Sequence, residues 1–391
     1  MATQVLQGTV ILPDRLLRAG QIVVEDGIIQ AVVGGADPPG GSDCRATLDV
    51  GEGFIAPGFI DVHVHGIAGA DTMDGSQESL RHMAERFATH GVTGFLPTTV
   101  TESLEVTRRV VSQVREYMAA QSQQASASAQ VLGIHLEGPW ISAQFKGAQN
   151  ERYILDPQEE PVRSILEAAR GTVKIISLAP ELPDADRTIR LLREEGIYVS
   201  IGHTGATYEQ ALQAVDLGAT HVTHCFNAMT GLHHRQPGVA GVALLVDDLF
   251  AELIADAVHV HPAVMRLLIR TKGRDRVMLI TDAMSAAEFP DGSYMLGGQE
   301  VLVRAGQARL HNGTLAGSTL VLDQAVRNLV RLCHISLVDA IFMASTTPAA
   351  AIGLDASKGR IRAGYDADLT ILDSELCPSA VMIRGTMWHT S

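Results

Sequence analysis

The sequence has few cysteines, little positive charge and no dense cysteine pattern. Its four cysteines are far apart and form no Cys-x-x-Cys pair, which argues against a disulfide framework and fits a reducing, cytoplasmic compartment. Lysine and arginine number 30 against 44 acidic residues, so the net charge is −14. That balance provides no general attraction to nucleic acid or to an anionic membrane surface. An anionic substrate would therefore need a locally basic pocket.

Long apolar segments and phosphate-binding glycine motifs are also missing. No apolar run approaches the roughly 18 to 20 residues that a membrane helix requires, and the first residues do not resemble a signal peptide. Neither GxGxxG nor GxxxxGK[ST] occurs, which argues against a doubly wound nucleotide-binding fold. These absences predict a cytoplasmic protein with neither a membrane nor a nucleic acid as partner.

The middle of the 391-residue chain alternates short apolar runs with amphipathic segments. The eight strand-like runs cover residues 54–65, 93–98, 131–137, 173–179, 197–202, 220–225, 251–257 and 276–281. Eight such runs with interleaved helices predict an α/β fold, a (β/α)8 TIM barrel, whose catalytic groups lie at the C-terminal ends of the strands.

Both ends of the sequence carry strand-like runs separated by turn signals. They cover residues 5–11, 21–24 and 28–33 at the start, and 360–362, 368–372 and 381–384 near the end. We expect residues 1–55 and 356–391 to build one small discontinuous β-sandwich domain, and residues 56–355 to form the barrel. Residues 285–319 contain Pro-Asp-Gly and Asn-Gly turns and predict hairpins over the barrel mouth.

The motif DVHVHG (61–66) closes the first predicted barrel strand. Alternate side chains of a strand share a face, so His63 and His65 should point together into the barrel, where two neutral imidazoles suit a divalent metal. An isolated His-x-His is more often structural. The position on the first strand and the polar residues at other strand ends favour a metal site here.

Four further polar residues lie at predicted strand ends. Glu137, His203 and His224 end the third, fifth and sixth runs, and Asp282 closes the eighth. Because these ends converge at the barrel mouth, we expect one or two divalent metals per subunit. Zinc is the expected ion, and iron, manganese and cobalt suit the same donors. Asp282 is placed to orient a metal-bound water and move its proton. His135 is either an outer partner of this site or barrel filling.

Residues just beyond two strand ends are candidates for substrate contacts. Asn227 and Arg235 lie in the loop after the sixth run, and His259 follows the seventh. The planar fork of an arginine suits phosphate, and it would supply the positive charge that the acidic chain otherwise lacks. The alternative is a solvated surface arginine.

Several longer strings resemble a known family. IAPGFIDVHVHG (55–66), KGRI (358–361) and DADL (366–369) are similar to the amidohydrolase superfamily. Within it, HLEGPW (135–140), LAPE (178–181), GHT (202–204), HCFNAM (224–229) and TDA (281–283) resemble the N-acetylglucosamine-6-phosphate deacetylases. The resemblance spans nearly the whole chain in the correct order.

This resemblance implies an amide hydrolase that releases acetate and D-glucosamine 6-phosphate, in amino-sugar catabolism and cell-wall recycling. It assigns Glu137, His203 and His224 to one metal site, and His63 and His65 to a second. It also implies that Glu137, rather than a carbamylated lysine, bridges the two sites.

The resemblance also implies roles around the metals. Asp282 becomes the general base and acid that serves a metal-bound hydroxide. Asn227, Ala228, Arg235 and His259 become the residues that bind the sugar phosphate, with Arg235 reaching across the interface of a homodimer. The preference between the gluco and galacto epimers of the phosphorylated N-acetylhexosamine stays open.

One position departs from the family. A histidine that contacts the substrate carbonyl follows Lys-Gly-Ala or a similar triplet in the family, whereas here Gln149 follows it. A glutamine amide donates a hydrogen bond but cannot become cationic, so we expect a weaker polarising contact or an altered specificity. Two alternatives stay open: a cyclic-amide hydrolase or deaminase without a phosphate subsite, and a catalytically silent sugar-phosphate sensor.

Overall fold

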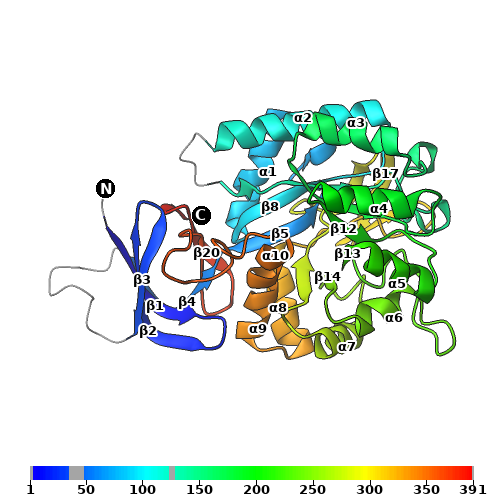
Figure 1. Ribbon diagram of the computed structural model, residues 1–391. Coiled ribbons are helices and arrows are strands. Elements are labelled where there is room, and N and C mark those ends of the chain that lie inside the picture. Colours follow the sequence, from blue (N-terminus) through cyan, green and yellow to red (C-terminus); the bar gives the residue numbers. More distant parts are fainter. Residues whose placement is uncertain (1–2, 35–47, 123–127, 390–391) are drawn as a thin grey trace.

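The computed structural model describes residues 3–34, 48–122 and 128–389 (Figure 1). Eight parallel strands form the predicted barrel, in the order β5-β8-β10-β11-β12-β13-β14-β15. Their bounds are β5 (Phe59–Val64), β8 (Val92–Thr99), β10 (Ile134–Glu137), β11 (Val173–Leu178), β12 (Tyr198–Ile201), β13 (Ala219–Val222), β14 (Phe250–Ile254) and β15 (Val277–Ile280). The backbone N–H of Asp282 donates to the carbonyl of His63 (2.9 Å) and joins the last strand to the first. The predicted TIM barrel is confirmed.

Helices surround these strands (Figure 1). They are α1 (Gln77–Thr89), α2 (Leu104–Gln121), α3 (Glu159–Ala169), α4 (Ala185–Glu194), α5 (Tyr208–Leu217), α6 (Gly238–Leu245), α7 (Pro262–Lys272), α8 (Leu322–Cys333), α9 (Leu337–Ala344) and α10 (Thr346–Ala351). Because helices cover the outside of the barrel, β5, β8, β10 and β15 are buried along their whole length. Side-chain caps fix several helix starts. Ser76 accepts a hydrogen bond at the start of α1, and Thr207 forms a capping box at the start of α5.

Several short elements lie between the main strands and helices of the barrel. They are β6 (Gly66–Ile67), β7 (Ala70–Asp71), β9 (Gln130–Val131) and the 3-10 turns η1 (Thr72–Asp74), η2 (Ala143–Phe145) and η3 (Glu151–Tyr153). The expected hairpins are present as an antiparallel three-stranded sheet of β16 (Gly292–Leu296), β17 (Gln299–Arg304) and β18 (Gln307–Leu310). This sheet has a small apolar core of its own around Val301 and Val303.

Strands from both ends of the sequence build a second sheet. These are β1 (Gln4–Ile11), β2 (Leu16–Glu25), β3 (Ile28–Gly34), β4 (Leu48–Pro57), β19 (Leu369–Leu372), β20 (Pro378–Ile383) and β21 (Thr386–His389). All seven belong to one sheet in the order β21-β20-β19-β4-β1-β2-β3. Both ends of the chain therefore contribute strands to the same β-rich unit, as expected. Strand β4 pairs in parallel with β1 and antiparallel with β19, with Leu369 opposite Pro57. The boundaries 1–55, 56–355 and 356–391 stay a prediction.

The strand expected at residues 360–362 is wrong. Gly359 and Gly364 both adopt a left-handed φ (79° and 87°), so this segment turns twice and Ile361 enters the core of the second sheet from a loop. Pro-Pro-Gly-Gly at 38–41, a turn signal of the sequence, lies outside the described residues, as do Cys44 and residues 123–127 of the polar, low-complexity segment 121–130. Cys225, Cys333 and Cys377 are free thiols.

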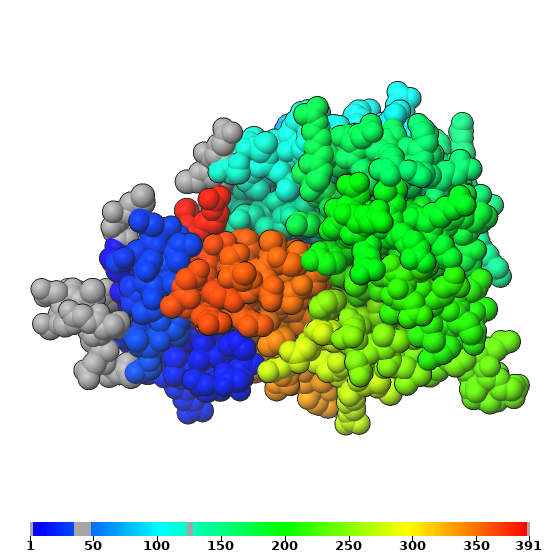
Figure 2. All heavy atoms as spheres, viewed as in Figure 1, coloured from blue at the N-terminus to red at the C-terminus, as the bar shows by residue number. Residues whose placement is uncertain are grey.

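A buried ion-pair cluster ties the second sheet to the barrel. The Nζ atom of Lys358 lies 2.6 Å from Asp368 and 2.8 Å from Asp366, and it also donates to Gln130 of β9 (3.2 Å). In Figures 1 and 2 the orange segment that contains Lys358 lies between the blue N-terminal strands and the barrel. Within the described ranges, every helix is too short or too polar to cross a bilayer.

Candidate active site

The predicted polar residues meet at one end of the barrel because each follows or ends a parallel strand. Glu137 is the last residue of β10, whereas His203, His224 and Asp282 each lie two residues beyond a strand. These three residues adopt left-handed backbone angles, with φ of 48°, 26° and 51°. Such strained conformations in non-glycine residues are typical of functional sites.

Glu137, His203 and His224 form the first cluster. The Oε1 atom of Glu137 lies 3.1 Å from the Nε2 atoms of both histidines, and these two nitrogens lie 3.1 Å apart. The Nδ1 atom of His203 donates to the carbonyl of Phe145 (2.9 Å), which leaves Nε2 with its lone pair. Three ligand atoms therefore converge on one point.

His63, His65 and Asp282 form the second cluster. The Oδ1 atom of Asp282 lies 3.1 Å from His65 Nε2 and 3.7 Å from His63 Nε2. His65 Nδ1 donates to the carbonyl of Thr98 (3.1 Å), so its Nε2 also faces the cluster with a lone pair. Glu137 stands between the two clusters, since its Oε1 lies 3.4 Å from His63 Nε2 and its Oε2 lies 3.4 Å from His65 Nε2.

The donor set fits divalent metal ions. The histidines and carboxylates are buried, and among the described residues the Nε2 atom of His63 has no hydrogen-bond partner. Facing lone pairs of buried nitrogens repel unless a cation or a proton lies between them. Mixed imidazole and carboxylate donors are those that zinc, iron and manganese accept.

The electrostatics of the metal-free chain also indicate a cation. Burial opposes a charge on His65, but its contacts with Asp282 and Glu137 raise its pKa to about 10. Burial likewise opposes a charge on His63, yet Glu252 and Glu137 raise its pKa well above the ordinary value. The carboxylates thus demand positive charge in this space, which protons or metal ions can provide.

His135 is barrel filling rather than a ligand. Its Nδ1 atom donates to the carbonyl of Val62 (3.0 Å), and its Nε2 atom accepts from the hydroxyl of Ser177 (2.8 Å). Both ring nitrogens are therefore engaged. Burial lowers the pKa of His135 to about 3, so the ring is neutral.

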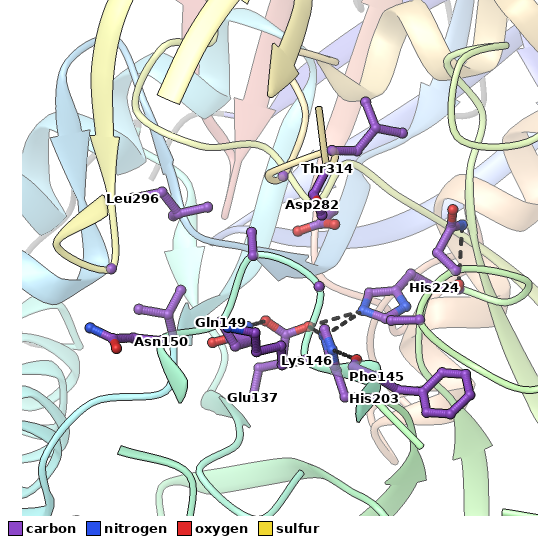
Figure 3. A pocket seen from close by; sticks show the side chains of 18 of the residues that line it. Glu137, Phe145, Lys146, Gln149, Asn150, His203, His224, Asp282, Leu296 and Thr314 are labelled. Carbon is purple, nitrogen blue, oxygen red and sulfur yellow. Dashed lines mark hydrogen bonds and ion pairs between the residues drawn. The ribbon is translucent and has the colours of Figure 1, made fainter. Parts of the chain in front are cut away.

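A cavity of about 480 Å³ opens above the clusters, and Figure 3 shows Glu137, His203, His224 and Asp282 on its wall. Most of the residues that the sequence assigned to the substrate also line it: Gln149, Asn227, Ala228 and His259. His63 and His65 lie in the buried layer that contacts Glu137 and Asp282. Arg235 is not among the lining residues. It is exposed and donates to His234.

Sequence reasoning missed several residues of the cavity and its support. Lys146 of the η2 loop and Leu296, Asn312 and Thr314 of the hairpin segment line the cavity. The sequence contains little indication of these four residues, because no motif marks them. Only the tertiary fold brings them to the barrel mouth.

Two carboxylates that support the site were missed as well. Glu252 accepts from His63 Nδ1 (2.9 Å) and from the backbone N–H of His224 (2.9 Å). Asp256 accepts from His259 Nδ1 (2.6 Å) and so leaves Nε2 of His259 for a ligand. A charged residue inside the apolar run of β14 was the available signal for Glu252.

Comparison with known proteins identifies relatives of the whole chain. The model of the amidohydrolase family matches residues 54–387. An N-acetylglucosamine-6-phosphate deacetylase of Lysinibacillus sphaericus is 44% identical over 323 residues, covering 83% of this chain and 82% of the relative. An N-acetylgalactosamine-6-phosphate deacetylase of Escherichia coli O157:H7 is 38% identical over 380 residues, covering 95% and 98%.

Solved structures agree with this comparison. A mutant N-acetyl-D-glucosamine-6-phosphate deacetylase of Mycobacterium smegmatis, in complex with N-acetyl-D-glucosamine 6-phosphate, superposes with a TM-score of 0.92 at 36% identity and covers 99% of both chains. The deacetylase of Thermotoga maritima gives a TM-score of 0.88 at 33% identity, covering 99% of this chain and all of the other.

Proposed function

Because the chain belongs to the amidohydrolase family of enzymes, we propose that it hydrolyses the acetamide of N-acetyl-D-glucosamine 6-phosphate to D-glucosamine 6-phosphate and acetate. One observation carries this proposal. A cavity large enough for a sugar phosphate has two histidine and carboxylate clusters at its base, and a carboxylate, Asp282, on its wall.

The metal ligands would be divided between the clusters. Glu137, His203 and His224 would hold one ion, and His63 with His65 would complete a second site, for which zinc is the expected metal. A bound divalent ion supplies Lewis acidity, which lowers the pKa of a water molecule and polarises the acyl oxygen.

Asp282 would move the protons. Burial opposes its charge, but the hydrogen bond from His65 and the nearby His63 lower its pKa, so the group is a carboxylate at neutral pH. It accepts a proton from the attacking water while the new C–O bond forms at the acyl carbon. It then returns this proton to the amide nitrogen as the C–N bond breaks, giving acetate and the free amine.

The phosphorylated sugar would lie against Asn227, Ala228 and His259. Arg235 is exposed and outside the cavity of its own chain, and the neighbouring residue Leu232 is 58% exposed. These features support a homodimer in which Arg235 serves the site of the partner subunit. The free thiols of Cys225, Cys333 and Cys377 support a reducing compartment, the cytoplasm.

The galacto epimer is a second candidate substrate. The relative from Escherichia coli O157:H7 that covers nearly all of this chain is named for N-acetylgalactosamine 6-phosphate. Both epimers present the same acetamide and the same phosphate, so they make the same demands on Asp282 and the metal ligands.

Acetate release tests the proposal. The purified protein is assayed with the 6-phosphates of N-acetylglucosamine and N-acetylgalactosamine and with unphosphorylated N-acetylglucosamine, after chelation and after zinc or iron is restored. We expect metal-dependent turnover of a phosphorylated sugar, with the faster epimer identifying the substrate. Equal turnover of the unphosphorylated sugar would contradict a phosphate subsite. No turnover by metal-loaded protein would contradict the proposed deacetylase activity.

A further inference from the structure

The side-chain amide of Gln149 lies buried between a backbone N–H and a carboxylate. Its Oε1 atom accepts from the backbone N–H of Thr101 (2.7 Å), and its Nε2 atom donates to Oε2 of Glu137 (2.5 Å). A backbone N–H can only donate and a carboxylate can only accept. The opposite orientation of the amide would therefore place two donors together and two acceptors together, so the orientation is fixed.

The two carboxylate oxygens of Glu137 consequently have different partners. Oε1 faces His203 and His224 at 3.1 Å, whereas Oε2 binds Gln149 (Figure 3) and lies 3.4 Å from Nε2 of His65. Holding Oε2 fixes the rotation of the carboxylate about its Cγ–Cδ bond. That rotation decides whether Oε1 lies where both histidine nitrogens point.

We propose that Gln149 is a positioning residue, which sets the orientation of the Glu137 carboxylate for the ion held with His203 and His224. The inference rests on the proposed metal-dependent function. It differs from the role that the sequence predicted, which was a contact with the acyl oxygen of the substrate. Groups that hydrogen-bond a metal ligand from behind typically change metal affinity by about 10–100-fold when they are removed.

The backbone around Gln149 is held independently of its side chain. The N–H of Gln149 donates to the carbonyl of Lys146 (2.9 Å), and Gln299 of β17 donates to the carbonyl of Ala148. Substitutions of the Gln149 side chain should therefore leave the loop in place.

Metal titration of substrate-free protein tests this role, with zinc affinity measured by chelator competition and the cobalt absorption spectrum as a report of ligand geometry. Gln149→Met keeps the side-chain length but removes both the donor to Glu137 and the acceptor for Thr101, whereas the second variant removes only the donor. We expect about 10–100-fold weaker binding of the first zinc and an altered cobalt spectrum. Gln149→Glu keeps the acceptor for Thr101 and adds a carboxylate beside Glu137. It has no donor for Oε2 of Glu137 and repels that oxygen, so we expect weaker binding of the first zinc and an altered cobalt spectrum here too, with a lower melting temperature of the metal-free protein.

Matched controls are Gln158→Met and Gln158→Glu, since Gln158 is exposed and is not among the residues that line the cavity. We expect them to leave zinc affinity within about twofold of the wild type. Unchanged zinc affinity in both Gln149 variants, with altered acetate release, would assign Gln149 to the substrate and overturn the proposal. Weaker zinc binding with an unchanged cobalt spectrum in both variants would show that the ligand geometry does not depend on Gln149, and would overturn it too. If the Gln149 variants show the expected changes in metal binding but metal-loaded wild-type protein releases no acetate, only the proposed deacetylase activity is contradicted.

Discussion

At the scale of single residues, the barrel mouth contains buried carboxylates that behave differently because their neighbours differ. Burial raises the pKa of Asp61 to about 7 even though Thr281 donates a hydrogen bond to it (2.6 Å). Burial also acts on Asp282, but the facing histidines lower its pKa. Only the second carboxylate is therefore reliably ionised at neutral pH, as a proton acceptor must be.

Asp282→Asn should separate catalysis from metal binding. An amide cannot accept the proton from water, so acetate release should fall by about 10²–10⁴-fold. The ion that we propose for Glu137, His203 and His224 should remain, as measured by metal analysis. Retained turnover near the wild-type rate would exclude Asp282 as the proton carrier.

Glu252→Gln should selectively weaken binding of the second ion that we propose at His63 and His65. Removing the negative charge makes His63 a less basic ligand, and the affinity for the second zinc should fall by about 10-fold or more. A two-step zinc titration measures this change. A uniform loss at both sites would instead indicate general damage to the barrel, because Glu252 also supports the backbone of His224.

The residues that sequence could identify are those whose type is rare at a strand end. His63, His65, Glu137, His203 and Asp282 stand out because apolar runs lead directly to them, and the structure brings them together. Glu252 could not be assigned from the sequence, because its role depends on the register between β13 and β14. Its carboxylate contacts His63 of β5, and only β15 lies between β14 and β5 in the closed barrel.

At the scale of elements, the eight strands follow from their apolar runs, whereas the packing between helices depends on contacts that no local pattern encodes. His90 at the end of α1 is an example. Its two ring nitrogens face Asp323 of α8 (3.0 Å) and Glu288 (2.5 Å). The same carboxylates pair with Arg327 and Arg86, so each acid is shared between a histidine and an arginine.

Stability should fall at alkaline pH through His90. Burial opposes its charge, but Asp323 and Glu288 raise its pKa to about 9, above the unfolded value of roughly 6.5. Its stabilising contribution is therefore complete below about pH 6.5 and is lost as the pH rises through 9. Thermal unfolding of wild type and His90→Gln between pH 6 and 10 should show a difference that shrinks with increasing pH. A constant difference would contradict this assignment.

At the scale of the whole molecule, the barrel and the terminal sheet are joined by the Lys358 cluster. Burial opposes the charge of Lys358, but Asp368 and Asp366 raise its pKa, so the ammonium persists at neutral pH. The sequence identified both KGRI and DADL, but only the fold shows that they meet beside Gln130 of the barrel.

Lys358→Met should destabilise the whole protein without affecting the metal clusters. The change leaves the buried Asp368 without its cation, which typically costs about 3–5 kcal/mol. Chemical denaturation measures the loss, and zinc content should stay unchanged. Arg187→Met is a suitable control, because this arginine is 86% exposed and its pair with Asp184 should contribute less than about 1 kcal/mol. Equal stability of the two variants would contradict a joining role for the cluster.

The position of β4 between β1 and β19 has a consequence for synthesis on the ribosome. Strand β1 leaves the ribosome early and can pair with β4, but β19 follows only after the entire barrel has been translated. At bacterial and eukaryotic elongation rates of about 5–20 residues per second, that interval lasts tens of seconds. Throughout it, one edge of β4 lacks its native neighbour, so the nascent chain carries an open strand edge that chaperones or other nascent chains can meet.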